Sequence, residues 1–173
     1  MFALHLPEAS ENATRARLLR RFPEATEAIP SEAVEQAIAA IVALTSGAAT
    51  ELGFVQLDLR HVPAFDRRVY AVARSVPAGE TITYGEIARR IGEPGAARAV
   101  GKALGNNPFA IIVPCHRVLG ADGKIGGFSA RGGITTKARL LSIEKARTSK
   151  IPALFDDLPL AVRAPRRGIR SAG

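Results

Sequence analysis

The sequence is organised around the stretch Ile111-Ile112-Val113-Pro114-Cys115-His116-Arg117-Val118. Three β-branched apolar residues run into a proline, which predicts a buried strand over 109–113. The only cysteine of the chain follows the proline, beside one of its three histidines. Residues that follow a buried strand lie at its end, where functional sites are commonly built. The competing interpretation is an inert core cysteine, because free cysteine is among the most buried residue types.

Length and composition predict a globular protein. A chain of 173 residues can bury a substantial core in one domain or in two small ones. No apolar stretch approaches the length of a membrane span, and the first residues lack the features of a signal peptide. A single cysteine excludes an internal disulfide and a zinc site built from several cysteines. We therefore expect a cytoplasmic protein that does not associate with a membrane.

Charge is distributed unevenly along the chain. Residues 1–59 carry four basic and eight acidic side chains, whereas residues 60–173 carry twenty basic and eight acidic ones. The formal net charge of +8 therefore comes from the second part of the chain. A basic region of this size suggests a polyanionic partner, although the same charge can serve solubility alone.

The first part of the chain, 1–61, has the pattern of a small α+β domain. Alternating apolar and polar residues predict two short strands, at 2–6 and at 54–59. Between them, a first helix would begin at a cap formed by Asn12 or Thr14.

A second helix is predicted over 31–46, followed by a linker at 62–64 and a third helix over 65–75. The second helix would pack through an apolar stripe that consists of Val34, Ile38, Ile41 and Val42.

Residues 83–105 have the pattern of a helix-turn-helix. Thr83 and Glu86 have the spacing of a capping box, which predicts the start of a helix. Gly92-Glu93-Pro94-Gly95 supplies a turn of the length that this motif uses, and the second helix would run from Ala96 to about Gly105.

The second of these two helices has unlike faces. Val100 and Leu104 lie on one face, and Arg98 and Lys102 lie nearly opposite, because two residues turn a helix by about 200°. Small residues line the edge between the faces: Ala97, Gly101 and Gly105. The pattern fits a helix pressed into a DNA groove, and it fits equally well a close helix–helix contact with a solvated cationic face.

Beyond the cysteine, Asp122-Gly123 predicts a hairpin turn between arms at 116–119 and 124–128. The returning arm contains Gly126-Gly127, and adjacent glycines there would let a ligand or another backbone come close.

A last helix is predicted over 137–147, with Thr135 or Thr136 as its cap. One stripe of this helix consists of Lys137, Leu140, Leu141 and Glu144. A carboxylate on an apolar stripe needs a partner, unless the helix end lies at the surface. Residues 150–173 are rich in proline and arginine, and we interpret them as a disordered basic tail.

Several separate motifs, foremost Pro114-Cys115-His116-Arg117-Val118, are similar to those of the O6-alkylguanine-DNA alkyltransferase family, and the resemblance runs over about 62–146. It implies an α+β fold. A small N-terminal α+β domain, 1–61, would precede a mostly helical, helix-turn-helix (winged-helix-like) alkyltransferase domain, 62–149. The basic tail, 150–173, would follow.

The resemblance also implies a reaction. An alkyl group would pass directly from O6 of guanine in double-stranded DNA to the sulfur of Cys115, once per molecule, without a cofactor or a metal. In the family, cysteine, water, histidine and glutamate form a relay, and the matching positions are Cys115, His116 and Glu144. Asn107 matches the asparagine that ties the recognition helix to the active-site loop.

DNA binding in the family uses a helix in the minor groove, where an arginine fills the gap left by the flipped base. Arg98 matches that arginine. Tyr84 matches a tyrosine that pushes on the phosphate and helps to protonate the base. The other positions expected to contact DNA or substrate are Gly85, Ala97, Val118, Ser129 and Lys137.

Two other function classes stay open at this point. One is a non-catalytic helix-turn-helix DNA-binding protein with a structural cysteine, which thiol reactivity far above that of free cysteine would exclude. The other is a cysteine hydrolase, which would need turnover and a histidine that faces the sulfur. We expect the protein to be a monomer.

Overall fold

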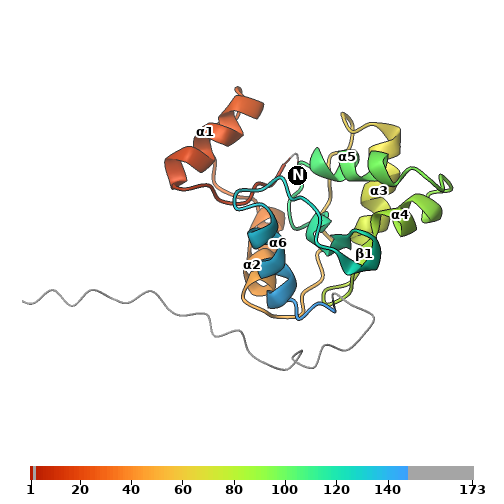
Figure 1. Ribbon diagram of the computed structural model, residues 1–173. Helices are drawn as coiled ribbons and strands as arrows, with labels where there is room; N and C mark the ends of the chain where they lie inside the picture. The colour runs from red at the N-terminus through yellow and green to blue at the C-terminus, as the bar shows by residue number, and fades with distance from the viewer. Residues whose placement is uncertain (2, 148–173) are drawn as a thin grey trace, which may run out of the picture.

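The structure is a computed structural model that describes residues 1 and 3–147, so the predicted basic tail lies outside the described residues. Figure 1 shows several short helices joined by long irregular segments. The elements in chain order are α1 (Glu11–Arg21), α2 (Glu32–Thr45), α3 (Ala64–Arg74), β1 (Ile82–Thr83), α4 (Tyr84–Arg90), α5 (Ala97–Gly105), the 3-10 turn η1 (Cys115–Arg117), β2 (Val118–Leu119), the 3-10 turn η2 (Ala121–Gly123) and α6 (Ile134–Ile143).

Helices α3, α4 and α5 form one packed group (Figure 1). The Oγ1 atom of Thr83 accepts a hydrogen bond from the N–H of Glu86 at 3.1 Å, which caps α4 as its sequence predicts. Both glycines of the turn between α4 and α5 have positive φ, 79° at Gly92 and 97° at Gly95, a conformation that favours glycine. Val100 is fully buried. The two helices and the tight turn predicted over 83–105 are therefore confirmed.

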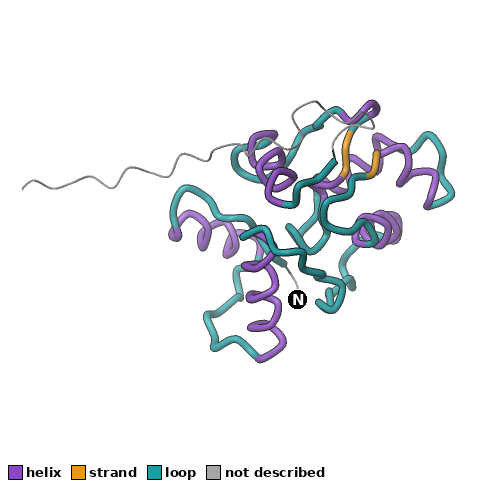
Figure 2. Tube along the Cα trace, turned by 90° about the horizontal axis from the view of Figure 1, so that it is seen from below, coloured by secondary structure: helices purple, strands orange, loops and turns teal. Residues whose placement is uncertain are grey.

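A two-stranded parallel sheet joins this helical group to the segment that contains the cysteine. The two strands lie side by side (Figure 2). Ile82 pairs with Val118, and Thr83 pairs with Leu119. Because β1 leads directly into α4 and β2 follows η1, the pairing holds the cysteine segment against the start of α4.

Helix α6 lies beside α2, and α1 stands apart from the α3–α5 group (Figure 1). The predicted apolar stripe of α2 is wrong for three of its four residues, because Val34, Ile38 and Val42 are 37%, 50% and 58% exposed and only Ile41 packs against the core. The helix instead buries Ala37 and Leu44. Residues of both groups satisfy a helical period, so the period alone did not fix which face would meet the core.

The three predicted strands at 2–6, 54–59 and 109–113 are not formed in the described residues. Leu4 makes an isolated parallel bridge to Phe109, and the start of the chain exchanges hydrogen bonds with the segment that contains Gln56 and Asp58. Short apolar runs do not distinguish a strand from an irregular segment that packs on the core, and here Val55, Phe109 and Val113 are buried without a ladder. The returning arm at 124–128 is likewise not a strand, although Gly120 donates to the Lys124 carbonyl at 2.7 Å.

Two helix caps differ from the predicted ones. Ser10, rather than Asn12 or Thr14, caps α1 by accepting a hydrogen bond from the N–H of Ala13. Helix α6 begins after Gly133, before the predicted threonine caps. None of the helices within the described residues has the length and hydrophobicity needed to cross a bilayer.

Candidate active site

Cys115 begins a 3-10 turn instead of following a strand. The chain before it turns sharply, and Ile111 has a φ of 69°, an uncommon conformation for a β-branched residue. The N–H of Cys115 donates to the Val113 carbonyl at 2.8 Å. The side chains of Ile111, Ile112 and Val113 are buried and hold this turn in place. The alternation of faces expected from a strand therefore does not describe Cys115 and His116.

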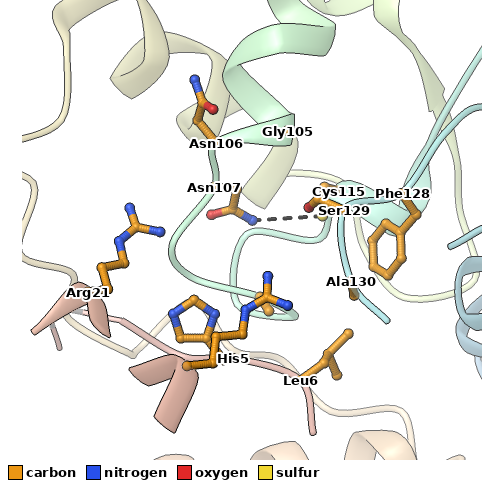
Figure 3. A pocket seen from close by; sticks show the side chains of 12 residues that line it. His5, Leu6, Arg21, Gly105, Asn106, Asn107, Cys115, Phe128, Ser129 and Ala130 are labelled. Carbon is orange, nitrogen blue, oxygen red and sulfur yellow. Dashed lines mark hydrogen bonds between the residues drawn. The ribbon is translucent and has the colours of Figure 1, made fainter. Parts of the chain in front are cut away.

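Asn107 connects the end of α5 to the cysteine turn. Its Nδ2 donates to the Val113 carbonyl at 2.9 Å and approaches Sγ of Cys115 at 3.8 Å, the contact marked in Figure 3. Its Oδ1 accepts the N–H of Phe109 at 2.9 Å. One amide thus fixes both ends of the turn and places a hydrogen-bond donor at the sulfur.

Behind the cysteine, a buried cluster joins η1 to the end of α6. Nε2 of His116 lies 3.0 Å from Oε1 of Glu144, and the Glu144 side chain is 3% exposed. Arg117 donates to both carboxylate oxygens at 2.8 Å, and its Nη1 donates to the Val76 carbonyl at 2.6 Å. The prediction that Glu144 points inward towards His116 agrees with this geometry.

Sequence reasoning missed Arg117, although it is part of the motif. The signal that could have found it is charge balance. A carboxylate on an apolar helix stripe needs a cationic partner, and a neutral histidine does not supply the charge. Arg117 supplies it through two parallel hydrogen bonds, the strongest geometry for an arginine and a carboxylate.

Burial and charge set the protonation of these groups. Burial raises the pKa of Glu144, but hydrogen bonds from His116 and Arg117 outweigh it and hold the pKa at about 2. Burial lowers the pKa of His116 in spite of the neighbouring carboxylate. Burial also raises the pKa of the Cys115 thiol, against the opposing effects of Asn107 and Lys137. At neutral pH the cluster therefore contains a thiol, a neutral imidazole and an ionised carboxylate.

The charge of Glu144 fixes the tautomer of His116. Nε2 faces an ionised carboxylate, so it carries the proton and donates. Nδ1 is then the unprotonated nitrogen, and it is buried without a hydrogen-bond partner among the described residues. This nitrogen can accept a proton.

Lys137 extends from α6 beneath the site and is fully buried. Its Nζ donates to the Val118 carbonyl at 2.5 Å and lies 5.7 Å from the centre of the Tyr84 ring. Burial lowers the pKa of Lys137, and the negative charge of a Cys115 thiolate opposes this effect. The hydrogen bond to the Val118 carbonyl thus holds the buried amine of Lys137, where its charge acts on the Cys115 thiol.

Tyr84, the first residue of α4, fits between two glycines. A Cβ atom at Gly101 would lie 3.9 Å from the ring, and one at Gly126 would lie 3.3 Å from the phenol oxygen. The absence of a side chain at Gly126 therefore leaves room for the Tyr84 phenol. Gly127 is exposed, and a Cβ atom there would meet nothing within 4 Å. Burial raises the pKa of Tyr84, so the phenol keeps its proton at neutral pH.

Most of the remaining predicted residues are exposed or half-buried. Arg98 is exposed on α5, together with Lys102, and Gly85 is exposed at the start of α4. Ala97 is half-buried and Ser129 is exposed, whereas Val118 is fully buried. The structure brings Ser129 to the cysteine but leaves Arg98 outside the cavities around it.

Two cavities meet at Cys115, and both are bounded by Gly105, Phe128 and Ser129. One, of about 310 Å³, lies beneath Tyr84 and Gly101. The other, of about 280 Å³, extends towards the N-terminal segment (Figure 3). It is lined there by His5, Arg17 and Arg21, which sequence reasoning did not connect to the site. Among the described residues, no group of three histidine, cysteine, aspartate or glutamate side chains could hold a metal ion.

Comparison with known proteins identifies relatives of this chain. Residues 64–146 match the family model for the DNA-binding domain of 6-O-methylguanine DNA methyltransferase. The methylated-DNA–protein-cysteine methyltransferase of Mycobacterium tuberculosis is 56% identical over 102 residues, which are 59% of this chain and 60% of that protein. The corresponding protein of Mycolicibacterium paratuberculosis is 49% identical over 124 residues, which are 72% of this chain and 70% of that protein. The chain belongs to the methylated-DNA–protein-cysteine methyltransferase family.

Solved structures agree with this family. The crystal structure of Mycobacterium tuberculosis OGT in complex with DNA is similar with a TM-score of 0.58 and 52% sequence identity, over 65% of this chain and 67% of that one. The chain spans about 60% of the length of the Mycobacterium tuberculosis relative it matches. The residues matched to the family model include Cys115, His116 and Glu144 but not the N-terminal wall of the second cavity.

Proposed function

We propose that the protein repairs DNA by transferring an alkyl group from O6 of guanine to Sγ of its own Cys115. The observation that carries the proposal is the position of the sulfur on the wall of two cavities, with the buried cluster of His116, Glu144 and Arg117 behind it. A structural cysteine needs neither an adjacent cavity nor a partnered histidine beside it. The family relationship supports the same activity.

The cluster is suited to activating the thiol. A thiol attacks as the thiolate, so a base must receive its proton. Nδ1 of His116 is the unprotonated nitrogen and, following the relay that the resemblance implies, would receive the proton through a bridging water. The imidazolium that results is stabilised by the ionised Glu144, which Arg117 holds in place.

In the transfer step, the thiolate of Cys115 attacks the alkyl carbon. The S–C bond forms as the C–O6 bond breaks, and the electron pair of that bond goes to the guanine. The base then takes up a proton, and Tyr84, whose phenol is protonated and borders the cavity, is the proposed donor. Tyr84 would regain a proton as the imidazolium of His116 releases the one it took from Cys115, so the net transfer is of the thiol proton to the base. The product is a thioether, which is a poor leaving group, so each molecule reacts once.

DNA binding is assigned to the α4–α5 pair. A base inside a duplex is out of reach, so the nucleotide must be flipped out of the stack. Arg98 on the exposed face of α5 would fill the gap, and Gly85 and Ala97 would lie against the DNA backbone. Ser129 borders the cavity that would receive the base. Lys137 donates a hydrogen bond to the Val118 carbonyl and would orient that part of the pocket.

The finer description of the architecture is part of the proposal. Residues 62–149 would form the winged-helix-like DNA-binding and alkyl-acceptor domain, and residues 1–61 a separate small domain. We further propose that the protein acts as a cytoplasmic monomer on double-stranded DNA that contains O6-alkylguanine.

The test is a titration of the protein with excess O6-methylguanine oligonucleotide, followed by intact mass and peptide mapping. We expect one methyl group per molecule, located on Cys115, and no further reaction. Repair beyond one equivalent would contradict the proposal and favour a turnover enzyme. Binding without methylation would favour a non-catalytic DNA-binding protein.

A further inference from the structure

The cavity on the N-terminal side of Cys115 differs from the cavity beneath Tyr84 in its charge. Arg17 and Arg21 of α1 and His5 line it, and no acidic residue does so. The cavity beneath Tyr84 is lined by no charged residue. The cationic wall comes from residues outside the segment that matches the family model, which begins at residue 64.

The geometry of the reaction directs substituents into one of the two cavities. In a direct displacement, O6, the attacked carbon and Sγ lie nearly in line, so any further atoms on that carbon project sideways from the line. For a base that occupies the cavity beneath Tyr84, the neighbouring cavity is the space open to those atoms, because it shares Cys115, Phe128 and Ser129 with the first. That cavity, of about 280 Å³, holds more than a methyl group.

The cationic groups there are only partly neutralised. Arg17 forms an ion pair with Glu8, whose side chain does not line the cavity. Arg21 makes no ion pair within the described part of the chain, and its nearest ring contact is Phe22, 5.9 Å from the guanidinium to the centroid. Nε2 of His5 is buried and has no hydrogen-bond partner among the described residues. The cavity thus presents hydrogen-bond donors and, at Arg21, a positive charge that is not paired with an anion among the described residues.

We infer that this cavity is a substituent pocket for O6-alkylguanines whose alkyl group ends in a carboxylate, with Arg21 as the residue that determines this specificity. The inference rests on the proposed function and names its substrate class. A carboxymethyl group is the smallest such substituent. Its methylene carbon bonds to Sγ as the C–O6 bond breaks towards the guanine, the thiol proton ends on the base, and the carboxylate stays on the protein beside Arg21.

The test compares two substituents of the same shape. O6-carboxymethylguanine and its neutral isostere O6-carbamoylmethylguanine are each supplied as the free base and within a duplex, and the rate of modification of Cys115 is followed by mass. We expect the wild-type protein to prefer the carboxymethyl substrate in both forms. Arg21→Gln should lower that preference about fivefold, the effect of losing one partly exposed charge-assisted contact. Arg21→Glu should lower it further.

A matched control is Arg20→Gln, which removes the same charge from the next position of α1, at an exposed residue that does not line the cavity. It should leave the preference unchanged. The inference fails if the wild-type protein shows no preference, or if Arg21→Gln leaves the ratio of the two rates unaltered. It also fails if Arg21→Gln slows both substrates equally and only in duplex DNA, because Arg21 would then contact a phosphate.

Transfer from O6-methylguanine by the wild-type protein is measured in parallel and distinguishes failure of the substituent pocket from failure of the proposed function. Normal methylation of Cys115 without a carboxylate preference overturns the substituent pocket alone. Absence of methylation overturns the proposed function itself.

Discussion

The buried cluster behind Cys115 and the exposed cationic face of α5 are built differently. Behind the sulfur, His116, Glu144 and Arg117 are buried and connected by hydrogen bonds of 2.8 to 3.0 Å. By contrast, the cationic face of α5 is exposed and lies outside the cavities around the sulfur, and Arg98 and Lys102 make no ion pair with the described residues. Removal of one group from a buried network leaves its partner buried without a hydrogen bond, which is costly. A substitution on an exposed face leaves no buried partner behind, so the buried cluster and the exposed face should respond to mutation in different ways.

Replacement of the sulfur removes the group that both sides serve, and it should have the largest effect. We expect Cys115→Ser to bind methylated DNA but to transfer no methyl group, because a hydroxyl ionises far less readily than a thiol. Binding is measured by fluorescence anisotropy and transfer by intact mass. Methyl transfer by this variant would show that the acceptor lies elsewhere.

Glu144→Gln tests the buried side. The amide keeps the shape but leaves Arg117 buried without a counter-charge and no longer supports a charged His116. We expect the free energy of unfolding to fall by about 2–4 kcal/mol and the transfer rate to fall by about 100-fold. DNA affinity should change little. Chemical denaturation and single-turnover kinetics provide these values.

Glu86→Gln is the matched control, because its carboxylate forms an exposed ion pair with Arg90 within α4. Its effect on stability should stay below about 1 kcal/mol. If both variants lose the same stability, or if Glu144→Gln transfers at the normal rate, the buried cluster does not act as described.

The depressed pKa of Glu144 predicts how stability depends on pH. The folded carboxyl titrates at about 2, below its ordinary value of 4.5. The unfolded chain therefore binds the proton first as the pH falls, and the stability contributed by Glu144 is lost between about pH 4.5 and pH 2. Glu144→Gln should flatten the decline of stability over this interval. An identical decline in both proteins would contradict the assignment.

Arg98→Ala tests the exposed side. Filling the hole left by a flipped nucleotide offsets an unstacking penalty of a few kcal/mol, so its loss should slow repair of duplex DNA by about tenfold or more. A free modified base leaves no hole, and its reaction rate should stay near that of the wild-type protein. The two rates are measured side by side, and equal losses would reject the role of Arg98. Stability should not change measurably.

Lys102→Ala should have the smallest effect and separates charge from base replacement on the same face. Contacts to phosphates release counterions and carry no base information. We expect the wild-type protein to bind DNA more tightly at low salt with little sequence preference, and Lys102→Ala to reduce the slope of log affinity against log salt by about one. A salt-independent affinity of the wild-type protein would remove the basis for this prediction.

Sequence reasoning performed differently on the two parts of the chain. Between Ala64 and Gly105 it located the helices and the Thr83 cap, because helix starts and turns depend on residues a few positions apart. Before residue 62 it assigned strands that are not formed and turned α2 towards the wrong face. Short apolar stretches there fit more than one structure, and packing partners distant in the chain decide among them.

For the site, the sequence by itself predicted a candidate site at Cys115 and His116, a helix stripe that ends at Glu144, and the cationic face of α5. These features follow from the chemistry of adjacent residues and from helical periodicity. Only the tertiary structure decided that Cys115 lies on a 3-10 turn, that Arg117 completes the buried cluster, and that His5, Arg17 and Arg21 reach the cavity beside the sulfur. Each of these depends on contacts between segments far apart in the chain, which the packing of the whole core selects and which no local pattern encodes.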